Sequence, residues 1–207
     1  MPRLDHASLT AARPDFAAIA SWIPAGASVL DLGCGDGSLL HYLKAERNVR
    51  GYGVEISDEG IVASIQNGVN VIQNDLDSGL ADFESASFDF VILSQTLQAT
   101  RHTEALLNEI LRVGRQGIVS FPNFTYWKNR MSVALGNMPV SKELPYQWYD
   151  TPNVHLCSFT DFENLCDTMK VEILARRVMT GGKEINLLPN LLGSMAVYRF
   201  KSDVIAR

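Results

Sequence analysis

The chain has a short apolar run directly before three glycines at alternate positions, in residues 29–37, Val-Leu-Asp-Leu-Gly-Cys-Gly-Asp-Gly. The apolar run predicts a short buried strand, and the pattern that follows in 38–43 predicts the start of a helix. Glycine permits positive φ and lets a ligand approach the backbone closely. Free amides at the helix start favour negative charge. A strand, a glycine-rich turn and a helix in this order predict a ligand cradle.

The spacing of the glycines argues against two common nucleotide-binding loops. A dinucleotide fingerprint that began at Gly33 would end in glycine at position 38, where the chain has Ser38. A phosphate-binding loop would need a lysine after the glycines, and none follows. Asp31 instead supplies a carboxylate suited to an ammonium group, while the amides suit the carboxylate of the same amino acid. S-adenosylmethionine (SAM) carries both groups; a glycine turn without a ligand is the alternative.

The pattern Asp31-x-Gly33-x-Gly35-x-Gly37 resembles the first motif of the class I SAM-dependent methyltransferases. Glu55 ends the next predicted strand, about 20 residues beyond the glycine loop. An acidic side chain in that place is suited to accept hydrogen bonds from ribose hydroxyls. A solvated loop glutamate is the alternative.

The segment Asn74-Asp75-Leu76 follows a third predicted strand, 69–72, and resembles the methyltransferase motif that meets the adenine. The Asp75 carboxylate can accept from an exocyclic amine, and the Leu76 amide can donate to a ring nitrogen. We choose Asp75 over Asp77 for this role. A polar turn is the alternative.

A fourth predicted strand, 87–93, is followed by Ser94 and Gln95. Ligands of open α/β sheets bind at the carboxyl ends of the strands, so any chemistry should occur there. The side chains on offer are neutral amides and hydroxyls without a strong general base, and we assign no catalytic residue and no metal site. The ten residues that we expect to bind SAM or S-adenosylhomocysteine are Asp31, Gly33, Cys34, Gly35, Gly37, Glu55, Asp75, Leu76, Ser94 and Gln95.

Strands alternate with helices up to residue 122, which predicts an α/β fold with a mostly parallel sheet and helices on both faces. The helix over 104–113 should bury a stripe of apolar side chains. We expect this stripe to comprise Ala105, Leu106, Ile110 and Val113. Thr160 and Glu163 have the spacing of a capping box, which predicts a helix that runs to about residue 169.

An aromatic and proline-rich insert at about 136–158 departs from this alternation. Its prolines should stiffen the loop. Tyr146, Trp148 and Tyr149 could line a substrate pocket, form a protein-binding face or pack as a lid on the core. We predict that the insert belongs to a single SAM-methyltransferase-like domain over 1–207.

Composition limits the class of partner. A net charge of −5 argues against a nucleic-acid partner, which would need a basic face. No stretch has the length and hydropathy of a membrane span, and the first residues show no signal-peptide pattern. Three scattered cysteines fit a reducing cytoplasm better than a disulfide framework.

Further segments across nearly the whole chain resemble the MetW family of methionine biosynthesis proteins. These segments are 15–24, 31–37, 95–98, 138–140, 144–146, 148–149 and 151–153, with His155. The resemblance implies a Rossmann-like class I methyltransferase fold with a seven-stranded sheet whose last strand is antiparallel. It also implies a cytoplasmic protein that accompanies and supports the homoserine O-acyltransferase of methionine synthesis, and it supplies no catalytic residues.

Two functions follow from these resemblances. The chain could be a SAM-binding partner or regulator of the acyltransferase, since SAM is a downstream product of methionine. It could instead be a methyltransferase for a small molecule, because methyl transfer needs mainly an aligned nucleophile and a closed site. A pocket that opens near Gln95 and Tyr146 would favour the enzyme. We favour the partner role and expect that the protein could also form a homo-oligomer.

Overall fold

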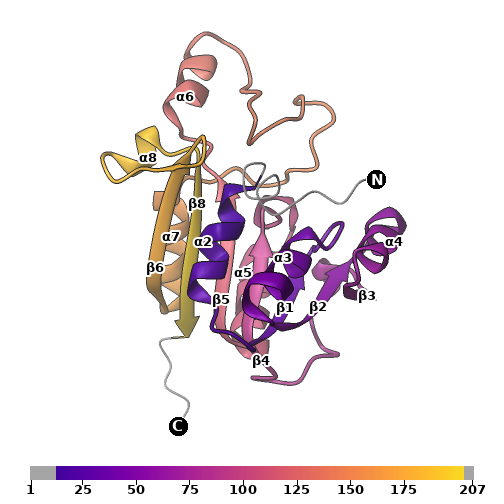
Figure 1. The fold of residues 1–207 in the computed structure, drawn as a ribbon. Helices are drawn as coiled ribbons and strands as arrows, with labels where there is room; N and C mark the ends of the chain where they lie inside the picture. Colours follow the sequence, from indigo (N-terminus) through magenta and orange to yellow (C-terminus); the bar gives the residue numbers. More distant parts are fainter. Residues whose placement is uncertain (1–12, 203–207) are drawn as a thin grey trace.

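The apolar run before the glycine loop forms β1, Ser28–Leu32, in the middle of an open sheet (Figure 1). The computed structural model describes residues 13–202. The side chains of β1 are buried on both faces of the sheet, with Leu30 and Leu32 on one face and Val29 on the other. Burial on both faces explains why Val29, Leu30 and Leu32 are all apolar rather than alternating with polar residues, and Asp31 is the one charged residue of the strand.

The sheet has eight strands in the order β3-β2-β1-β4-β5-β8-β6-β7. The strands beyond β1 are β2 (Arg50–Glu55), β3 (Asn70–Gln73), β4 (Phe88–Ser94), β5 (Gly114–Pro122), β6 (Val171–Thr180), β7 (Lys183–Glu184) and β8 (Met195–Ser202). The strands β1 to β5 are parallel, and β8 runs antiparallel to both β5 and β6. The predicted fold class is therefore confirmed. The sheet has one strand more than the seven that we expected. This additional strand is the two-residue β7, which pairs with β6 after the turn at Gly181 and Gly182.

Helices cover both faces of this sheet (Figure 1). The α-helices are α2 (Pro14–Trp22), α3 (Ser38–Arg47), α4 (Asp58–Gln66), α5 (Thr103–Val113), α6 (Trp127–Ala134), α7 (Phe159–Met169) and α8 (Pro189–Leu192), with short 3₁₀ turns η1 (Leu76–Ser78) and η2 (Leu97–Ala99). One core layer holds side chains of α2 and α3, and the other holds side chains of α5 and α7. No described helix is long and apolar enough to cross a membrane.

The strand register brings three loops to one edge of the sheet. Leu32 pairs with Val54 of β2, and Asp31 pairs with Ile92 of β4. Because these strands are parallel, the segments after β1, β2 and β4 meet at their carboxyl ends. The glycine loop, Glu55 and Gln95 are thus neighbours in space although they are far apart in the sequence.

Two local predictions need correction. Helix α5 buries Leu107, which is 1% exposed, whereas Ala105 lies on the exposed side. The helix faces the core with positions 106, 107, 110 and 113, so the buried stripe is rotated toward Leu107 and away from Ala105. The capping box of α7 is formed by Ser158 and Asp161, two residues earlier than Thr160 and Glu163, because Phe159 already belongs to the helix.

The chain leaves β5 at its carboxyl end and runs through α6 into the insert, and this part of the chain extends beyond that edge of the sheet (Figure 1). Leu144 is its buried anchor, at 6% exposure. Tyr146, Trp148 and Tyr149 are 47%, 72% and 71% exposed, so these aromatic rings do not pack as a lid on the core.

The corrected capping box gives a test of the fold. Ser158 Oγ accepts a hydrogen bond from the Asp161 amide at 3.1 Å, and the Asp161 carboxylate accepts one from the Ser158 amide at 2.9 Å. We expect Ser158→Ala to lower the free energy of unfolding by about 1 kcal/mol, measured by urea denaturation. The control Thr160→Ala should change it by less than about 0.5 kcal/mol. A larger loss in Thr160→Ala than in Ser158→Ala would contradict this assignment.

Candidate functional site

A cavity of about 290 Å³ lies where the loops after β1, β2 and β4 meet. Its walls come from the glycine loop, the end of β2, the η1 turn and the segment that leads into η2. The lining residues are Gly33, Val54, Glu55, Ile56, Asn74, Asp75, Leu76, Asp77, Gln95, Thr96, Ala99 and Thr100. We name it the carboxyl-edge cavity.

Glu55 joins the glycine loop to the end of β2. Its carboxylate accepts hydrogen bonds from the amides of Gly35 at 2.8 Å, Ile56 at 3.0 Å and Ser57 at 2.9 Å. The side chain is 9% exposed and lines the cavity. A carboxylate has about four acceptor positions, so one remains for a further donor from the cavity.

Gly33 lies where the loop must pass close to the segment after β4. Its φ is +68°, and a Cβ at this position would lie 2.7 Å from Thr96 Cγ2. Any larger residue would therefore be strained and would push against the cavity wall. The loop needs glycine here for two independent reasons.

The amides of the loop are largely engaged within the protein. Those of Gly33 and Cys34 donate to the Val54 carbonyl, and the Ser38 amide donates to the Asp36 carboxylate. We expected free amides at the start of α3 for a ligand carboxylate. The Asp36 carboxylate instead accepts the hydrogen bond of the Ser38 amide, since a carboxylate is itself favoured at a helix N-terminus.

Asp31 is buried beneath the loop, at 2% exposure. Burial raises the pKa of its carboxyl to about 7; the nearby Arg13 acts against this rise, and the neighbouring Asp15 and Glu55 add to it. Its Oδ1 has no hydrogen-bond partner among residues 13–202. A buried carboxyl oxygen without a partner is costly, and a cationic donor that reached it would relieve that cost.

The charge of the cavity is negative. Glu55, Asp75 and Asp77 line it, and no lysine or arginine does. The Asp75 carboxylate accepts from the Asp77 amide at 2.9 Å, and that of Asp77 accepts from the Arg101 amide at 2.9 Å. The three acidic side chains of the lining would repel a phosphate group in the cavity. They would attract a cationic nucleoside.

The structure brings half of the predicted site residues to the cavity wall and places the other half behind it. Gly33, Glu55, Asp75, Leu76 and Gln95 line the cavity. The residues Asp31, Cys34, Gly35, Gly37 and Ser94 hold the loop and the strand ends in position.

Cys34 and Gly37 illustrate this supporting role. Cys34 fills the space beside Gly53, where a Cβ would collide with its sulfur. Burial raises the pKa of the Cys34 thiol to about 12, so it stays protonated and unreactive. Gly37 precedes α3 with φ +73°, and a Cβ there would meet Ser64 and Val69.

A buried polar network beside the cavity escaped the sequence analysis. Asp15 is fully buried in α2 and accepts hydrogen bonds from Arg13, Ser94 and Ser120. It fixes the ends of β4 and β5 against the start of α2. Its spacing of four residues from the buried Ile19 places it on the inner face of the helix and could have predicted its burial.

Gln95 separates the carboxyl-edge cavity from a smaller one of about 130 Å³, which Arg13, Lys142, Glu143 and Met195 also line. The backbone of Gln95 has φ +53°, an uncommon conformation for a residue other than glycine. Its amide donates to Ser120, and its Nε2 donates to Met195 Sδ at 3.1 Å. Such local strain is concentrated at functional sites in proteins.

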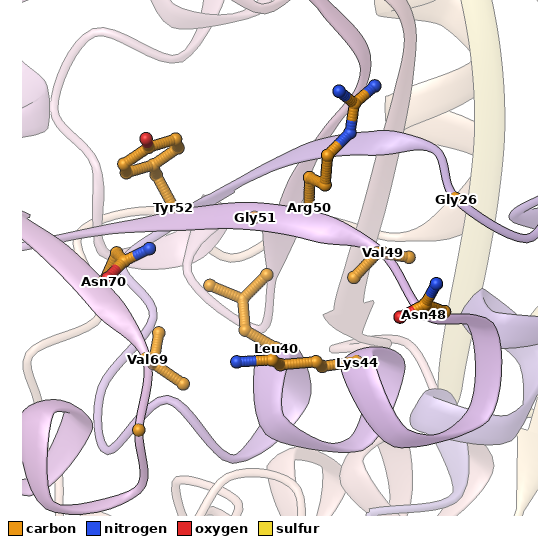
Figure 2. Close-up of a pocket in the computed structure, with 11 residues that line it drawn as sticks. Gly26, Leu40, Lys44, Asn48, Val49, Arg50, Gly51, Tyr52, Val69 and Asn70 are labelled. Carbon is orange, nitrogen blue, oxygen red and sulfur yellow. The ribbon is translucent and has the colours of Figure 1, made fainter.

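A larger groove of about 550 Å³ lies at the amino ends of β2 and β3. Figure 2 shows Arg50 and Tyr52 on one side of β2, with Leu40 and Lys44 on the other. The polar groups of this groove therefore do not converge on one point. Leu40 packs closely under Gly51, where a Cβ would lie 2.7 Å from it, and we assign the groove a packing role.

The described residues include no group of three His, Cys, Asp or Glu side chains that could hold a metal ion.

The family model of methionine biosynthesis protein MetW matches residues 13–200. The chain belongs to the MetW family.

A second comparison agrees with this family. The chain is 41% identical over 169 residues to the bifunctional methionine biosynthesis protein MetXA/MetW of Rhodopirellula baltica. The match covers 77% of this chain and 27% of that protein, so the chain spans about a quarter of the length of its relative.

Solved structures agree on the fold. A SAM-dependent methyltransferase of Thermotoga maritima, named as a possible histamine N-methyltransferase, has a TM-score of 0.68 at 19% identity, with 93% of this chain and 89% of that chain covered. A SAM-dependent methyltransferase of Archaeoglobus fulgidus has a TM-score of 0.66 at 17% identity, with 94% and 93% covered. The MetW chain therefore has the Rossmann-like fold of these methyltransferases.

The raised pKa of Asp31 predicts how stability depends on pH. Folding raises this pKa from 3.8 to about 7, so the folded state holds an extra proton between these values and loses stability as the pH rises through them. Each pKa unit corresponds to about 1.4 kcal/mol. Between pH 5 and pH 8, we expect urea denaturation to show about 2 kcal/mol more loss in the wild type than in Asp31→Asn. Equal losses in both proteins would contradict a neutral buried Asp31.

Proposed function

We propose that this MetW-family protein binds SAM or S-adenosylhomocysteine in the carboxyl-edge cavity and acts as a partner of homoserine O-acyltransferase in methionine biosynthesis. The acidic, lysine-free and arginine-free lining of the cavity is the observation that carries the cofactor assignment. SAM has a cationic sulfonium and no phosphate, which suits this lining. When bound, it carries a methyl group that is activated for transfer.

The residues present fit the parts of such a ligand. The free acceptor position of Glu55 is suited to a ribose hydroxyl. The exposed carboxylate of Asp75 is suited to the exocyclic amine of adenine, and the amide of Leu76 to a ring nitrogen. The open Oδ1 of Asp31 is suited to the ammonium group. Gly33, Cys34, Gly35, Gly37, Ser94 and Gln95 complete the proposed set by shaping the loop and the end of β4.

The partner assignment is supported by the Rhodopirellula relative. That protein is named MetXA/MetW, so a MetXA part and a MetW part share one polypeptide. We infer that the present chain makes the corresponding association with a separate homoserine O-acyltransferase in the cytoplasm. Because SAM forms downstream of methionine, a SAM-binding partner could report the level of the end product to the acyltransferase.

A small-molecule methyltransferase is the second candidate. The 130 Å³ cavity on the other side of Gln95 could hold a small acceptor beside the carboxyl-edge cavity. Tyr146 is exposed and lines neither cavity, so these cavities are not the pocket near Gln95 and Tyr146 that would favour the enzyme. The partner role therefore remains the stronger proposal.

The test measures the initial rate of the purified homoserine O-acyltransferase from the same cell. The rate is determined alone, with this protein, and with this protein plus saturating SAM. We expect a several-fold higher rate when the protein is added and a change in that rate when SAM is present. If neither the rate nor complex formation responds to SAM, the regulatory role is wrong. An unchanged rate in every mixture would favour the methyltransferase.

A further inference from the structure

Exposed apolar side chains concentrate on one end of the molecule. Thirteen of the eighteen large apolar side chains that are exposed in the described part of the chain belong to residues 127–156 and 187–188. We call this surface the insert face. Its most exposed members are Leu135, Leu187, Trp148 and Tyr149, each exposed by more than 70%.

The two parts of the insert face are joined. α6 and the loop before α8 both lie beyond the carboxyl edge of the sheet (Figure 1). Asn123 Nδ2 donates to the Asn190 carbonyl at 2.8 Å, and Thr125 Oγ1 bonds Asn190 Oδ1 at 3.0 Å. These bonds hold the segment between β5 and α6 against α8, so Leu187 and Leu188 belong to the same end of the molecule.

The composition of the insert face is that of a protein interface. Tryptophan, tyrosine and methionine are enriched in the buried centres of interfaces, and charged residues are depleted there. Residues 127–156 contain three basic and two acidic residues, a net charge of +1, whereas the whole chain carries −5. An apolar and nearly neutral surface of this kind suits a protein partner better than nucleic acid, which needs a basic face.

The insert face is held in place by hydrogen bonds. The amides of Val154 and His155 both donate to the Gln98 carbonyl, at 2.8 and 3.0 Å. Ser141 and Leu144 are linked by two further bonds, and Leu144 is buried. A surface that is ordered before binding loses less conformational entropy when a partner docks.

The same attachment places the insert face beside the carboxyl-edge cavity. Gln98 lies in η2, between the cavity-lining residues Thr96 and Ala99. His155 Nε2 also lies 3.2 Å from the carbonyl oxygen of Arg101, whose amide is bonded by the cavity residue Asp77. A protein on the insert face would thus contact elements that are fixed to the cavity wall.

We propose that the insert face is the surface on which this protein docks homoserine O-acyltransferase. The inference rests on the proposed function and adds to it the location of the interface. The acyltransferase is the occupant that we select because the MetXA part is joined covalently to the MetW part in the Rhodopirellula relative. Trp148 and Tyr149 are the expected anchors, since large aromatic side chains carry much of the energy of interfaces.

The test compares the affinity of the purified acyltransferase for the wild-type protein and for two variants of the insert face, measured by biolayer interferometry. We expect Trp148→Ala/Tyr149→Ala to weaken binding by at least about tenfold. Leu135→Lys, a substitution elsewhere on the insert face, should also weaken it, and circular dichroism checks the fold of each variant. The matched control is Val62→Ala/Ile65→Ala on α4, where the two side chains are 54% and 62% exposed. This control should bind within about twofold of the wild type.

The outcomes separate this inference from the proposed function. Wild-type affinity in the folded insert-face variants would overturn the inference and leave the partnership intact. No complex with the wild-type protein would overturn the proposed function itself. A wild-type dimer that the insert-face variants dissociate would show that a second copy of the chain occupies the face, and this would also overturn the inference.

Discussion

Three backbone amides converge on the Glu55 carboxylate, and this arrangement fixes the glycine loop against the end of β2. The loop cannot move away from the sheet without leaving a nearly buried carboxylate short of hydrogen bonds, which is costly. On its other side, Gly33 allows the loop to lie against Thr96 after β4. The walls of the carboxyl-edge cavity are therefore set by contacts within the protein, before any ligand binds.

Acidic side chains are concentrated at this carboxyl edge of the sheet. Asp31 lies in a buried position near Asp15 and Glu55, with Arg13 as the nearby cation. The carboxyl-edge cavity adds two acidic side chains and no basic one. A cation that entered would reduce the repulsion among these carboxylates, and Asp31 lies buried behind the cavity wall. Ligand binding and the protonation of Asp31 should therefore be linked, because binding of an ammonium group requires the ionised carboxylate.

The sheet and the strand–glycine loop–helix order could be predicted from the sequence because both depend on local patterns. The apolar run of β1, the glycine spacing and the position of Glu55 need no knowledge of distant contacts. The capping box of α7 was misplaced because Ser158/Asp161 and Thr160/Glu163 share the same spacing, and the packing of Phe159 decides between them. The Asp15 network was missed because its partners, Ser94 and Ser120, lie about 80 and 105 residues away in the sequence. The exposure of Tyr146, Trp148 and Tyr149 also depends on tertiary packing, so the sequence alone left their role open.

The most direct measurement of the central claim is SAM binding by isothermal titration calorimetry to the wild type, Glu55→Gln and Glu59→Gln. Glu59 is an exposed residue in the first turn of α4 and serves as the charge-matched control. The account predicts that the wild type and Glu59→Gln bind SAM with equal affinity, and that Glu55→Gln binds at least about tenfold more weakly, a loss of about 1.4 kcal/mol. No binding to the wild type, or equal binding to all three proteins, would contradict the assignment of the carboxyl-edge cavity to SAM.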